Sequence, residues 1–301
     1  MSSHESSRAV FYALAANLGI AVAKGIAAFI TKSGSMMAEA IHSVADCTNQ
    51  ILLLIGMKQA GKPENKQYPL GYGRSVYFWS FIVAILLFST GGLFSIYEGI
   101  HKLDSSEPVH MPLVALSVLF ISFILESLSL YGGLKEAKKI RGEKSFFRWL
   151  KETRNSEIII ILGEDSAAVS GLFAAFIFVS LSVFLNMPVL DAVGSIFIGV
   201  ILVIVSFLLI LRMKSLLIGR SAELEIERAI KDIILTIPEI DEIYHLITVQ
   251  MGPYIMLACK VKMKSDLSIN KACIKINDME KRIKSEIPEI KWSFIEPDVL
   301  E

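Results

Sequence analysis

Four ionisable side chains lie inside long apolar stretches of the sequence, where charged groups are costly and usually functional. His42 and Asp46 are four residues apart, so a helix places them on one face, and Asn49 continues the same stripe. Glu164 and Asp165 are adjacent in a second apolar stretch. An imidazole and a carboxylate one turn apart form half of a site for a divalent cation such as Zn²⁺. We expect the adjacent carboxylates to form the other half.

Each half has an alternative explanation. His42 and Asp46 also suit a buried hydrogen-bonded pair that packs helices together. Glu164 and Asp165 also suit a helix start at the membrane interface, where carboxylates favour the helix dipole. Glu164 lies seven residues beyond Glu157, a rise of about 10 Å, so a position inside the membrane is possible. Two adjacent carboxylates there need a metal ion or a proton to neutralise them, which favours an exchange of metal for protons.

Other charged residues lie within or at the ends of the apolar stretches, and we consider Lys24, Glu39, Glu98, Glu126 and Asp191 as groups on the ion path or as partners that hold helices together. Lys24 and Glu126 lie deep in their stretches, and Glu98 and Asp191 lie near the external ends. For these four we favour the supporting role. Glu39 precedes His42 by about one turn and suits a vestibule at the outer end.

Six apolar blocks must position these side chains, because each is long enough to cross a hydrocarbon core as a helix. They are Arg8–Ile30, Met36–Met57, Val76–Tyr97, Met111–Gly133, Glu157–Leu185 and Val189–Ile218. The chain is 53% hydrophobic and its mean hydropathy is +0.55. A large soluble helical core is the alternative, and six such blocks in succession oppose it. We therefore predict a polytopic α-helical membrane protein with six transmembrane helices.

The basic residues of the loops indicate the orientation. The loops after the second and fourth blocks hold Lys58, Lys62, Lys66, Arg74, Lys135, Lys138, Lys139, Arg141, Lys144, Arg148, Lys151 and Arg154. The other three loops hold Lys32, Lys102 and no basic residue. By the positive-inside rule the even loops are cytosolic, so both termini are cytosolic too. The segment Gly142–Lys151 suits either an interfacial helix or a plain solvated loop.

The pattern becomes that of a soluble domain after Gly219. It predicts helices at Glu223–Thr236 and Asn270–Glu286, and strands at Tyr244–Met251, Tyr254–Lys264 and Lys291–Ile295. This order predicts a small α+β (ferredoxin-like) domain with two helices on one face of a sheet. We expect a transmembrane domain over residues 1–220 and a regulatory or dimerising cytosolic domain over 221–301.

Charge and cysteine content exclude other classes. With 30 Lys or Arg and 30 Asp or Glu the formal net charge is zero, which excludes a strongly basic nucleic-acid binder. The zero is a cancellation, since residues 222–301 carry 11 basic and 15 acidic side chains and the remainder is correspondingly positive. An acidic cytosolic half suits the attraction of dications. Three scattered cysteines give neither a disulfide framework nor a zinc knuckle.

The chain resembles the cation diffusion facilitator family of metal exporters along nearly its whole length. The resemblance rests on HSVAD (42–46), YPLGYGR (68–74), Asp191 at the start of the sixth block, FIEPD (294–298) and the C-terminal domain. Tyr68 stands where the family often has His. EDSAAVSG (164–171) and the basic loop 142–155 look closest to the zinc transporter nine branch.

The resemblance implies a homodimer that exports Zn²⁺, or a related dication, from the cytosol against inward proton flow. It also implies that His42 and Asp46 supply two ligands of the transport site. The family's second ligand pair falls on Glu164 and Ala168, and alanine cannot bind a metal. Asp165 is the obvious replacement, although it points about 100° away from Glu164 on an ideal helix. The fourth ligand is therefore Asp165, Asn49 or a water molecule.

Several expectations remain open at this point. Mn²⁺, Fe²⁺ and Co²⁺ are alternatives to Zn²⁺ as substrate, although a histidine among carboxylates suits zinc. In the cytosolic domain His245, Glu296 and Asp298 are weaker metal candidates, and we favour the alternative that they are surface or core residues without a metal. The alternative functions are a membrane scaffold that dimerises or docks partners, and a metal channel. We expect no enzyme, and a location in the bacterial inner membrane.

Overall fold

The computed structural model describes the backbone of residues 3–105 and 108–299 and the side chains of residues 17–103 and 108–299. The chain divides into two compact units. The first comprises Met1–Gly56, Trp79–Glu143 and Ser156–Met213, and the second comprises Met57–Phe78, Lys144–Asn155 and Lys214–Glu301. The second unit therefore contains more than the expected segment 221–301, because the first basic loop and the part Lys144–Asn155 of the second belong to it.

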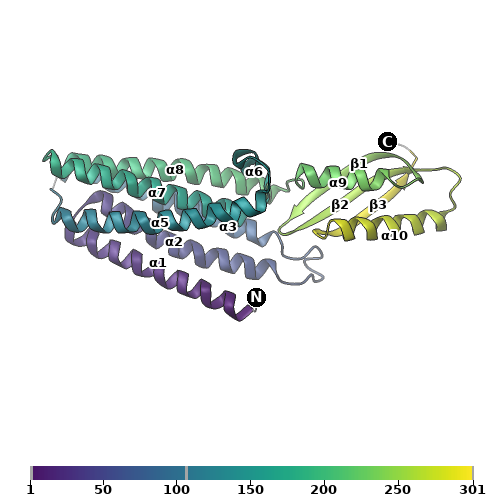
Figure 1. The fold of residues 1–301 in the computed structure, drawn as a ribbon, viewed down its shortest axis with the longest axis horizontal. Helices are drawn as coiled ribbons and strands as arrows, with labels where there is room; N and C mark the ends of the chain where they lie inside the picture. The colour runs from purple at the N-terminus through teal and green to yellow at the C-terminus, as the bar shows by residue number, and fades with distance from the viewer. Residues whose placement is uncertain (1–2, 106–107, 300–301) are drawn as a thin grey trace. The chain divides into compact units, whose positions relative to one another are not determined.

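The first unit is a bundle of long helices (Figure 1). Its helices are α1 (Ser3–Thr31), α2 (Gly34–Ala60), α3 (Ser75–Leu86), η1 (Leu87–Leu93), α4 (Phe94–Ser105), α5 (Pro112–Arg141), α7 (Ser156–Phe184) and α8 (Val189–Ile218). Three of them, α3, η1 and α4, follow one another without a break, and η1 is a π-helical turn. Each apolar block of the sequence thus corresponds to a helical segment.

Among the residues that the structure describes, four segments are long and apolar enough to cross a membrane: Ser75–Leu103, Pro112–Arg141, Ser156–Phe184 and Val189–Ile218. The part of α1 whose side chains are described, Asn17–Thr31, is apolar as well. Helix α2 has the length, but Glu39, His42, Asp46 and Asn49 lower its hydropathy. The structure therefore supports a helical membrane protein, and the count of six spans stays a prediction.

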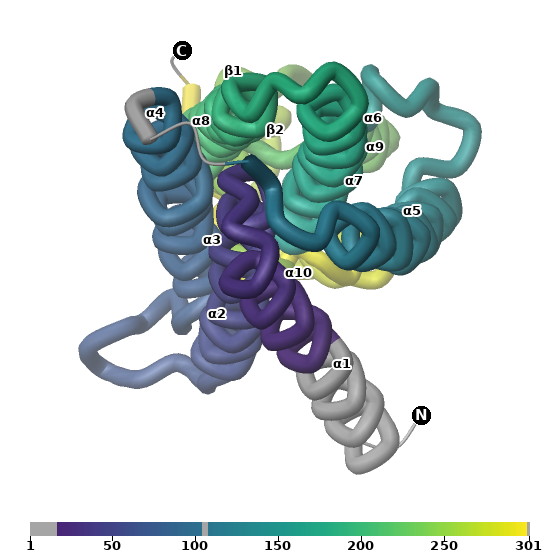
Figure 2. The backbone as a smooth tube through the Cα atoms, turned by 90° about the vertical axis from the view of Figure 1, so that its left-hand side faces the viewer, coloured from purple at the N-terminus to yellow at the C-terminus, as the bar shows by residue number. Residues whose placement is uncertain are grey.

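Small residues bring the helices of the bundle close together. A Cβ atom added to Gly199 of α8 would lie 2.7 Å from the carbonyl oxygen of Gly92 in η1. A Cβ on Gly99 of α4 would lie 2.8 Å from the carbonyl oxygen of Ala192. Such close backbone contacts are typical of packing between membrane helices. On the other side of the bundle α5 lies along α7 and also contacts α1 (Figure 2).

The C-terminal part of the second unit is a small α+β domain. Its elements are α9 (Leu224–Leu235), β1 (Ile240–Met251), β2 (Tyr254–Met263), α10 (Ile269–Glu286) and β3 (Ile290–Asp298). The sheet has the order β1-β2-β3, with β1 antiparallel and β3 parallel to β2. These are the last five elements of the ferredoxin-like β-α-β-β-α-β order, so the described sheet has three strands where that fold has four.

Both helices of this domain cover one face of the sheet, as the sequence predicts (Figure 1). Alternate residues of β2 point into this core, and they meet isoleucines of α9 and Met279 and Ile283 of α10. The inward residues of β2 are Ile255, Leu257, Cys259 and Val261.

Cysteine reactivity tests this packing. Cys259 is 4% exposed and burial raises the pKa of its thiol to about 11, so about one thiol in a thousand is ionised at pH 8. Cys273 is exposed on α10. We expect a maleimide to label Cys273 within minutes at pH 8 and Cys259 only after unfolding, measured by mass spectrometry on single-cysteine variants. Equal labelling of both in the folded protein would contradict this core.

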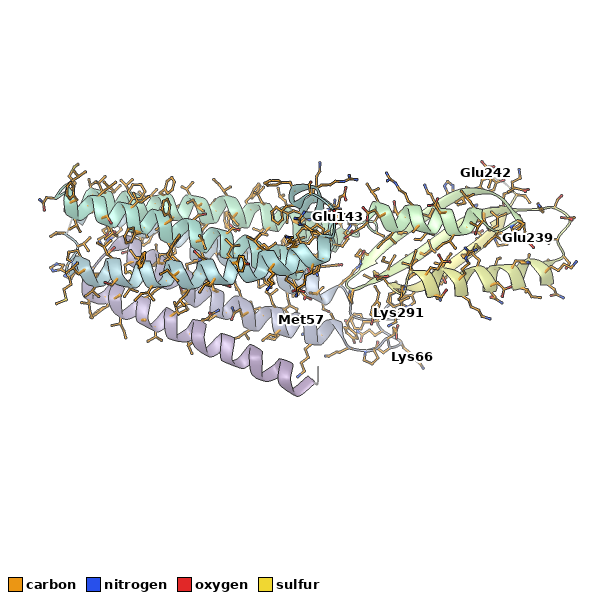
Figure 3. The ribbon with its side chains drawn as sticks, viewed as in Figure 1. Met57, Lys66, Glu143, Glu239, Glu242 and Lys291 are labelled. Atoms are coloured by element: carbon orange, nitrogen blue, oxygen red, sulfur yellow. The ribbon has the colours of Figure 1, made fainter. Side chains whose placement is uncertain are left out.

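Glycines of the 68–74 motif allow its loop to pack against the β1–β2 turn, all within the second unit. Gly252 has φ +71°, and a Cβ atom there would lie 2.3 Å from the carbonyl oxygen of Gly73. The Tyr77 hydroxyl donates a hydrogen bond to the Gly252 carbonyl at 3.1 Å. Lys291 of β3 reaches the same loop, with its Nζ 2.6 Å from Glu64 Oε1 (Figure 3). The motif therefore has a structural role that its sequence did not reveal.

The sequence allowed either a helix or a loop for the segment 142–151. The structure has a short helix there, α6 (Phe146–Glu152). Trp149 is buried, whereas Phe147 is 81% exposed. Lys144, just before the helix, lies 2.8 Å from Glu225 and 3.3 Å from Glu223 at the start of α9. These ion pairs hold α6 to the C-terminal domain within the second unit.

Candidate functional site

Helix α2 presents a polar stripe inside the bundle. His42 is 1% exposed, and its Nε2 lies 3.5 Å from Asp46 Oδ2 one turn later. Asn49 is fully buried one turn beyond Asp46. The helical spacing therefore puts these three residues along one face of α2, as the sequence predicts.

Asn49 joins α2 to α7. Its Nδ2 donates a hydrogen bond of 2.7 Å to Glu164 Oε1, and Glu164 is 8% exposed. Asn49, a candidate fourth ligand, thus holds the Glu164 carboxylate in place in this structure. An amide donor on one carboxylate oxygen leaves the other oxygen available to a cation.

Asp165 points towards another helix than Glu164 does. Its Oδ2 accepts a hydrogen bond of 3.0 Å from the Ser129 hydroxyl of α5. This direction agrees with the rotation of about 100° between adjacent helical residues. Both carboxylates nevertheless line one cavity, because α5 lies along α7.

This cavity has a volume of about 40 Å³ and collects four carboxylates from three helices. That is room for a small ion or a water molecule. Its acidic lining residues are Asp46, Glu126, Glu164 and Asp165, and its other lining residues are Asn17, Ile20, Ser43, Gln50, Ser129 and Ala168. Four carboxylates in an apolar bundle require cations or protons to neutralise them. The cavity is therefore suited to a divalent cation.

The sequence underestimated Glu126, to which it gave a supporting role. Glu126 lines the cavity from α5, one turn before Ser129. His42 is not among the lining residues and stands beside Asp46. Within the described side chains, no three His, Cys, Asp or Glu residues converge closely enough to hold one metal ion. His42, Asp46, Glu164 and Asp165 are thus neighbours without forming a closed coordination sphere.

Lys24 and Glu39 form a buried ion pair beside this stripe. Both side chains are fully buried, and Lys24 Nζ lies 3.2 Å from Glu39 Oε2. The same ammonium donates to the Ser43 hydroxyl at 2.8 Å. Lys24 therefore joins α1 to α2 at the level of the site.

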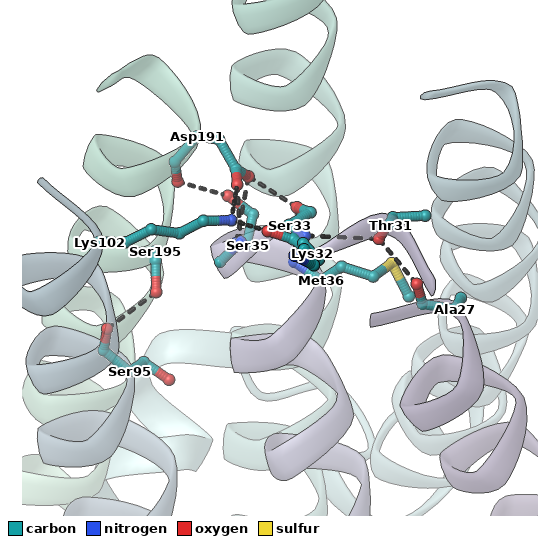
Figure 4. Close-up of polar contacts among 11 residues, drawn as sticks. Ala27, Thr31, Lys32, Ser33, Ser35, Met36, Ser95, Lys102, Asp191 and Ser195 are labelled. Carbon is teal, nitrogen blue, oxygen red and sulfur yellow. Dashed lines mark hydrogen bonds and ion pairs between the residues drawn. The ribbon is translucent and has the colours of Figure 1, made fainter. Parts of the chain in front are cut away.

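Asp191 closes a second polar cluster at the start of α2 (Figure 4). It accepts hydrogen bonds from the Ser33 hydroxyl at 2.7 Å and from the backbone N–H groups of Gly34 and Ser35 at 2.6 and 3.2 Å. Lys102 Nζ of α4 lies 3.0 Å from the same carboxylate and also donates to the Lys32 carbonyl. Asp191 thus caps α2, a supporting role of the expected kind. Glu98 is half-buried on α4 and does not line the cavity.

The candidate metal residues of the C-terminal domain are arranged around a lysine. Lys260 pairs with His245 on one side and with Glu296 on the other in the strand register. Its Nζ lies 2.5 Å from Asp298 Oδ2. An ammonium in the middle of the set repels a cation, so we do not include these residues in the proposed site.

Comparison with known proteins gives the family. Residues 10–218 match the cation efflux transmembrane domain, and residues 222–298 match the cytoplasmic domain of cation efflux proteins. A solved structure of a MamM C-terminal domain variant covers 26% of this chain and 96% of its own, at 14% identity and a TM-score of 0.24.

Among curated proteins, the chain is 28% identical over 274 residues to the mitochondrial proton-coupled zinc antiporter SLC30A9 of Homo sapiens, covering 89% of this chain and 47% of that protein. It is 33% identical over 229 residues to metal tolerance protein C4 of Arabidopsis thaliana, covering 74% and 49%. It is 23% identical to the magnetosome protein MamB of Magnetospirillum gryphiswaldense, covering 94% and 90%.

The chain spans about half the length of the zinc antiporter and metal tolerance relatives. The match to the transmembrane domain covers more than half of the chain, and that to the cytoplasmic domain covers most of the remainder. The resemblance drawn from the sequence motifs is thereby confirmed, and the matched domains are those of cation efflux proteins and not of an enzyme. This chain is an integral membrane protein of the cation efflux family, with relatives among the SLC30A9 zinc antiporters.

Proposed function

We propose that this protein is a secondary transporter that exports a divalent metal cation from the cytosol in exchange for protons. We propose Zn²⁺ as its main substrate. The observation that carries the proposal is the cavity in which Asp46, Glu126, Glu164 and Asp165 meet inside an apolar bundle. Carboxylates bind a dication or protons in turn, so one site serves both ions. The name of the zinc antiporter relatives supports zinc and proton coupling.

The proposed transport site consists of His42, Asp46, Glu164 and Asp165, with Asn49 holding Glu164. Asp46 and His42 come from α2 and the two adjacent carboxylates from α7. In the metal-bound state the helices draw these side chains together around the ion. Protons then displace the ion on the outer side, because metal ligands must be deprotonated. His42 is the natural switch near neutral pH.

The proposed topology has six spans, with both termini in the cytosol and a boundary between the two domains near residue 220. The basic loops after α2 and around α6 support this orientation. The match to a cytoplasmic domain of cation efflux proteins supports the cytosolic side for residues 222–298. A homodimer joined through this domain, in a lipid bilayer, completes the proposal. The bacterial inner membrane stays a prediction, which membrane fractionation tests.

Transport in proteoliposomes tests the function. We expect an acidic lumen to drive Zn²⁺ into vesicles that hold the purified protein, against a zinc gradient, while protons leave the lumen. A fluorescent zinc indicator and a pH-sensitive dye inside the vesicles report the two fluxes. The same assay with Mn²⁺, Fe²⁺ and Co²⁺ ranks the substrates.

The alternatives predict other results in this assay. A scaffold gives neither flux, and a channel gives zinc movement down its own gradient that a proton gradient does not drive uphill. Either result with correctly folded, membrane-inserted protein rejects the proposed antiport.

A further inference from the structure

Lys24 places a cationic group where the proposed pathway continues beyond the acidic cavity. Its ammonium is fully buried in α1 and contacts Glu39 Oε2 at 3.2 Å and the Ser43 hydroxyl at 2.8 Å. Glu39 precedes Asp46 by seven residues on α2, a rise of about 10 Å. In the proposed orientation this position lies on the outer side of the cavity.

Three buried polar atoms beside this ammonium have no hydrogen-bond partner among the described residues. They are Glu39 Oε1, His42 Nδ1 and His42 Nε2. His42 follows Glu39 by three residues, so the two side chains are neighbours on the helix surface. Unsatisfied buried polar groups are expensive, and each calls for an explanation. A carboxylate oxygen and an imidazole nitrogen are also the groups that bind Zn²⁺.

Helix α7 makes room at this position. A Cβ atom added to Gly171 would lie 2.8 Å from Glu39 Oε1, so the glycine admits the carboxylate. Gly171 lies two turns after Glu164 on α7, as Glu39 lies two turns before Asp46 on α2. The two helices thus face each other at two levels, the acidic cavity and the Glu39 position.

We propose that Glu39 forms a second, outer station for the dication beside His42 of the transport site, and that Lys24 occupies this station as a resident cation in this conformation. This inference rests on the proposed function. The ammonium neutralises Glu39 and keeps a metal ion from resting there. A metal ion that leaves the cavity outward displaces the ammonium from Glu39, and the ammonium returns once the ion is released.

Metal binding to Lys24→Met tests this role. Without the ammonium Glu39 is an uncompensated buried carboxylate, so we expect the variant to bind about one Zn²⁺ per chain more than the unaltered protein. Isothermal titration of Zn²⁺ into the protein in detergent measures the stoichiometry. We also expect zinc flux in proteoliposomes to fall about 10-fold or more, because the retained ion blocks the path. The double variant Lys24→Met/Glu39→Gln should lose the additional ion.

Controls separate this role from a structural one. Lys58→Met removes a cation from the exposed end of α2 and should leave both readouts unchanged. Lys24→Gln keeps hydrogen-bond donors for Glu39 without the charge, and it replaces Lys24→Met if that variant does not fold. The inference is overturned if the folded single variant binds no additional ion or keeps the full flux. An unaltered protein without flux rejects the proposed function instead, whereas the stoichiometry still tests the station.

Discussion

We expect zinc flux in proteoliposomes to fall more than about 100-fold when Asp46 is replaced by Asn. The amide keeps the shape of the side chain and removes its charge, so the cavity loses one of four carboxylates. Asp46 also lies beside His42, at 3.5 Å. Mutation of a residue that hydrogen-bonds to a metal ligand lowers metal affinity or activity by about 10–100-fold. We expect the loss of a direct ligand to have a larger effect. The loss should appear in zinc uptake and in the coupled proton movement alike.

Glu136→Gln is the matched control for Asp46→Asn. Glu136 is an exposed carboxylate on α5, paired with Lys139 on the surface, and its replacement makes the same change of charge away from the cavity. This control should transport as the unaltered protein does. If Asp46→Asn keeps full zinc and proton flux while it is folded in the membrane, then the assignment of the site to α2 is wrong.

Replacing Asp191 with Ala should produce the largest loss of stability in the bundle. The carboxylate is fully buried and accepts hydrogen bonds from Ser33 and from the backbone of Gly34 and Ser35. It also compensates the charge of Lys102 at 3.0 Å. Removal of one partner of a buried ion pair costs about 3–5 kcal/mol. We expect a marked drop in the thermal unfolding temperature in detergent, followed by tryptophan fluorescence.

Two further variants isolate the cause of that loss. Ser195→Ala removes one nearby hydrogen bond, from the Ser195 hydroxyl to the Ser95 carbonyl, and should cost about 1 kcal/mol. Asp191→Ala/Lys102→Met removes both charges and should recover part of the stability. A single variant Asp191→Ala as stable as Ser195→Ala would show that this cluster does not hold the start of α2.

Most element boundaries were predictable because local patterns decide them. The block Val189–Ile218 coincides with α8, and the strand Tyr254–Lys264 ends one residue from the end of β2. Long apolar runs form helices in lipid because every backbone group must be satisfied internally. The local pattern did not predict the π-helical turn Leu87–Leu93, which packs against Val203 of α8 at Gly92. The number of spans depends on α1 and α2, and the polar stripe of α2 makes its hydropathy ambiguous.

The candidate site divides in the same way. The sequence by itself determined that His42 and Asp46 share a face of one helix, that Glu164 and Asp165 are adjacent in another, and that the motifs belong to metal exporters. The first two of these follow from the helical period, which relates residues within one segment. The third follows from the sequence motifs alone.

Only the tertiary structure decided which helices those faces meet. It brings Glu126 of α5 into the cavity, turns Asp165 towards Ser129, joins Asn49 to Glu164 and pairs Lys24 with Glu39. These contacts join residues far apart in the chain, and the packing of α1, α2, α5 and α7 selects them. The helical pattern predicts the face of the helix on which a side chain lies. The residue that this side chain contacts depends on which other helix packs against that face.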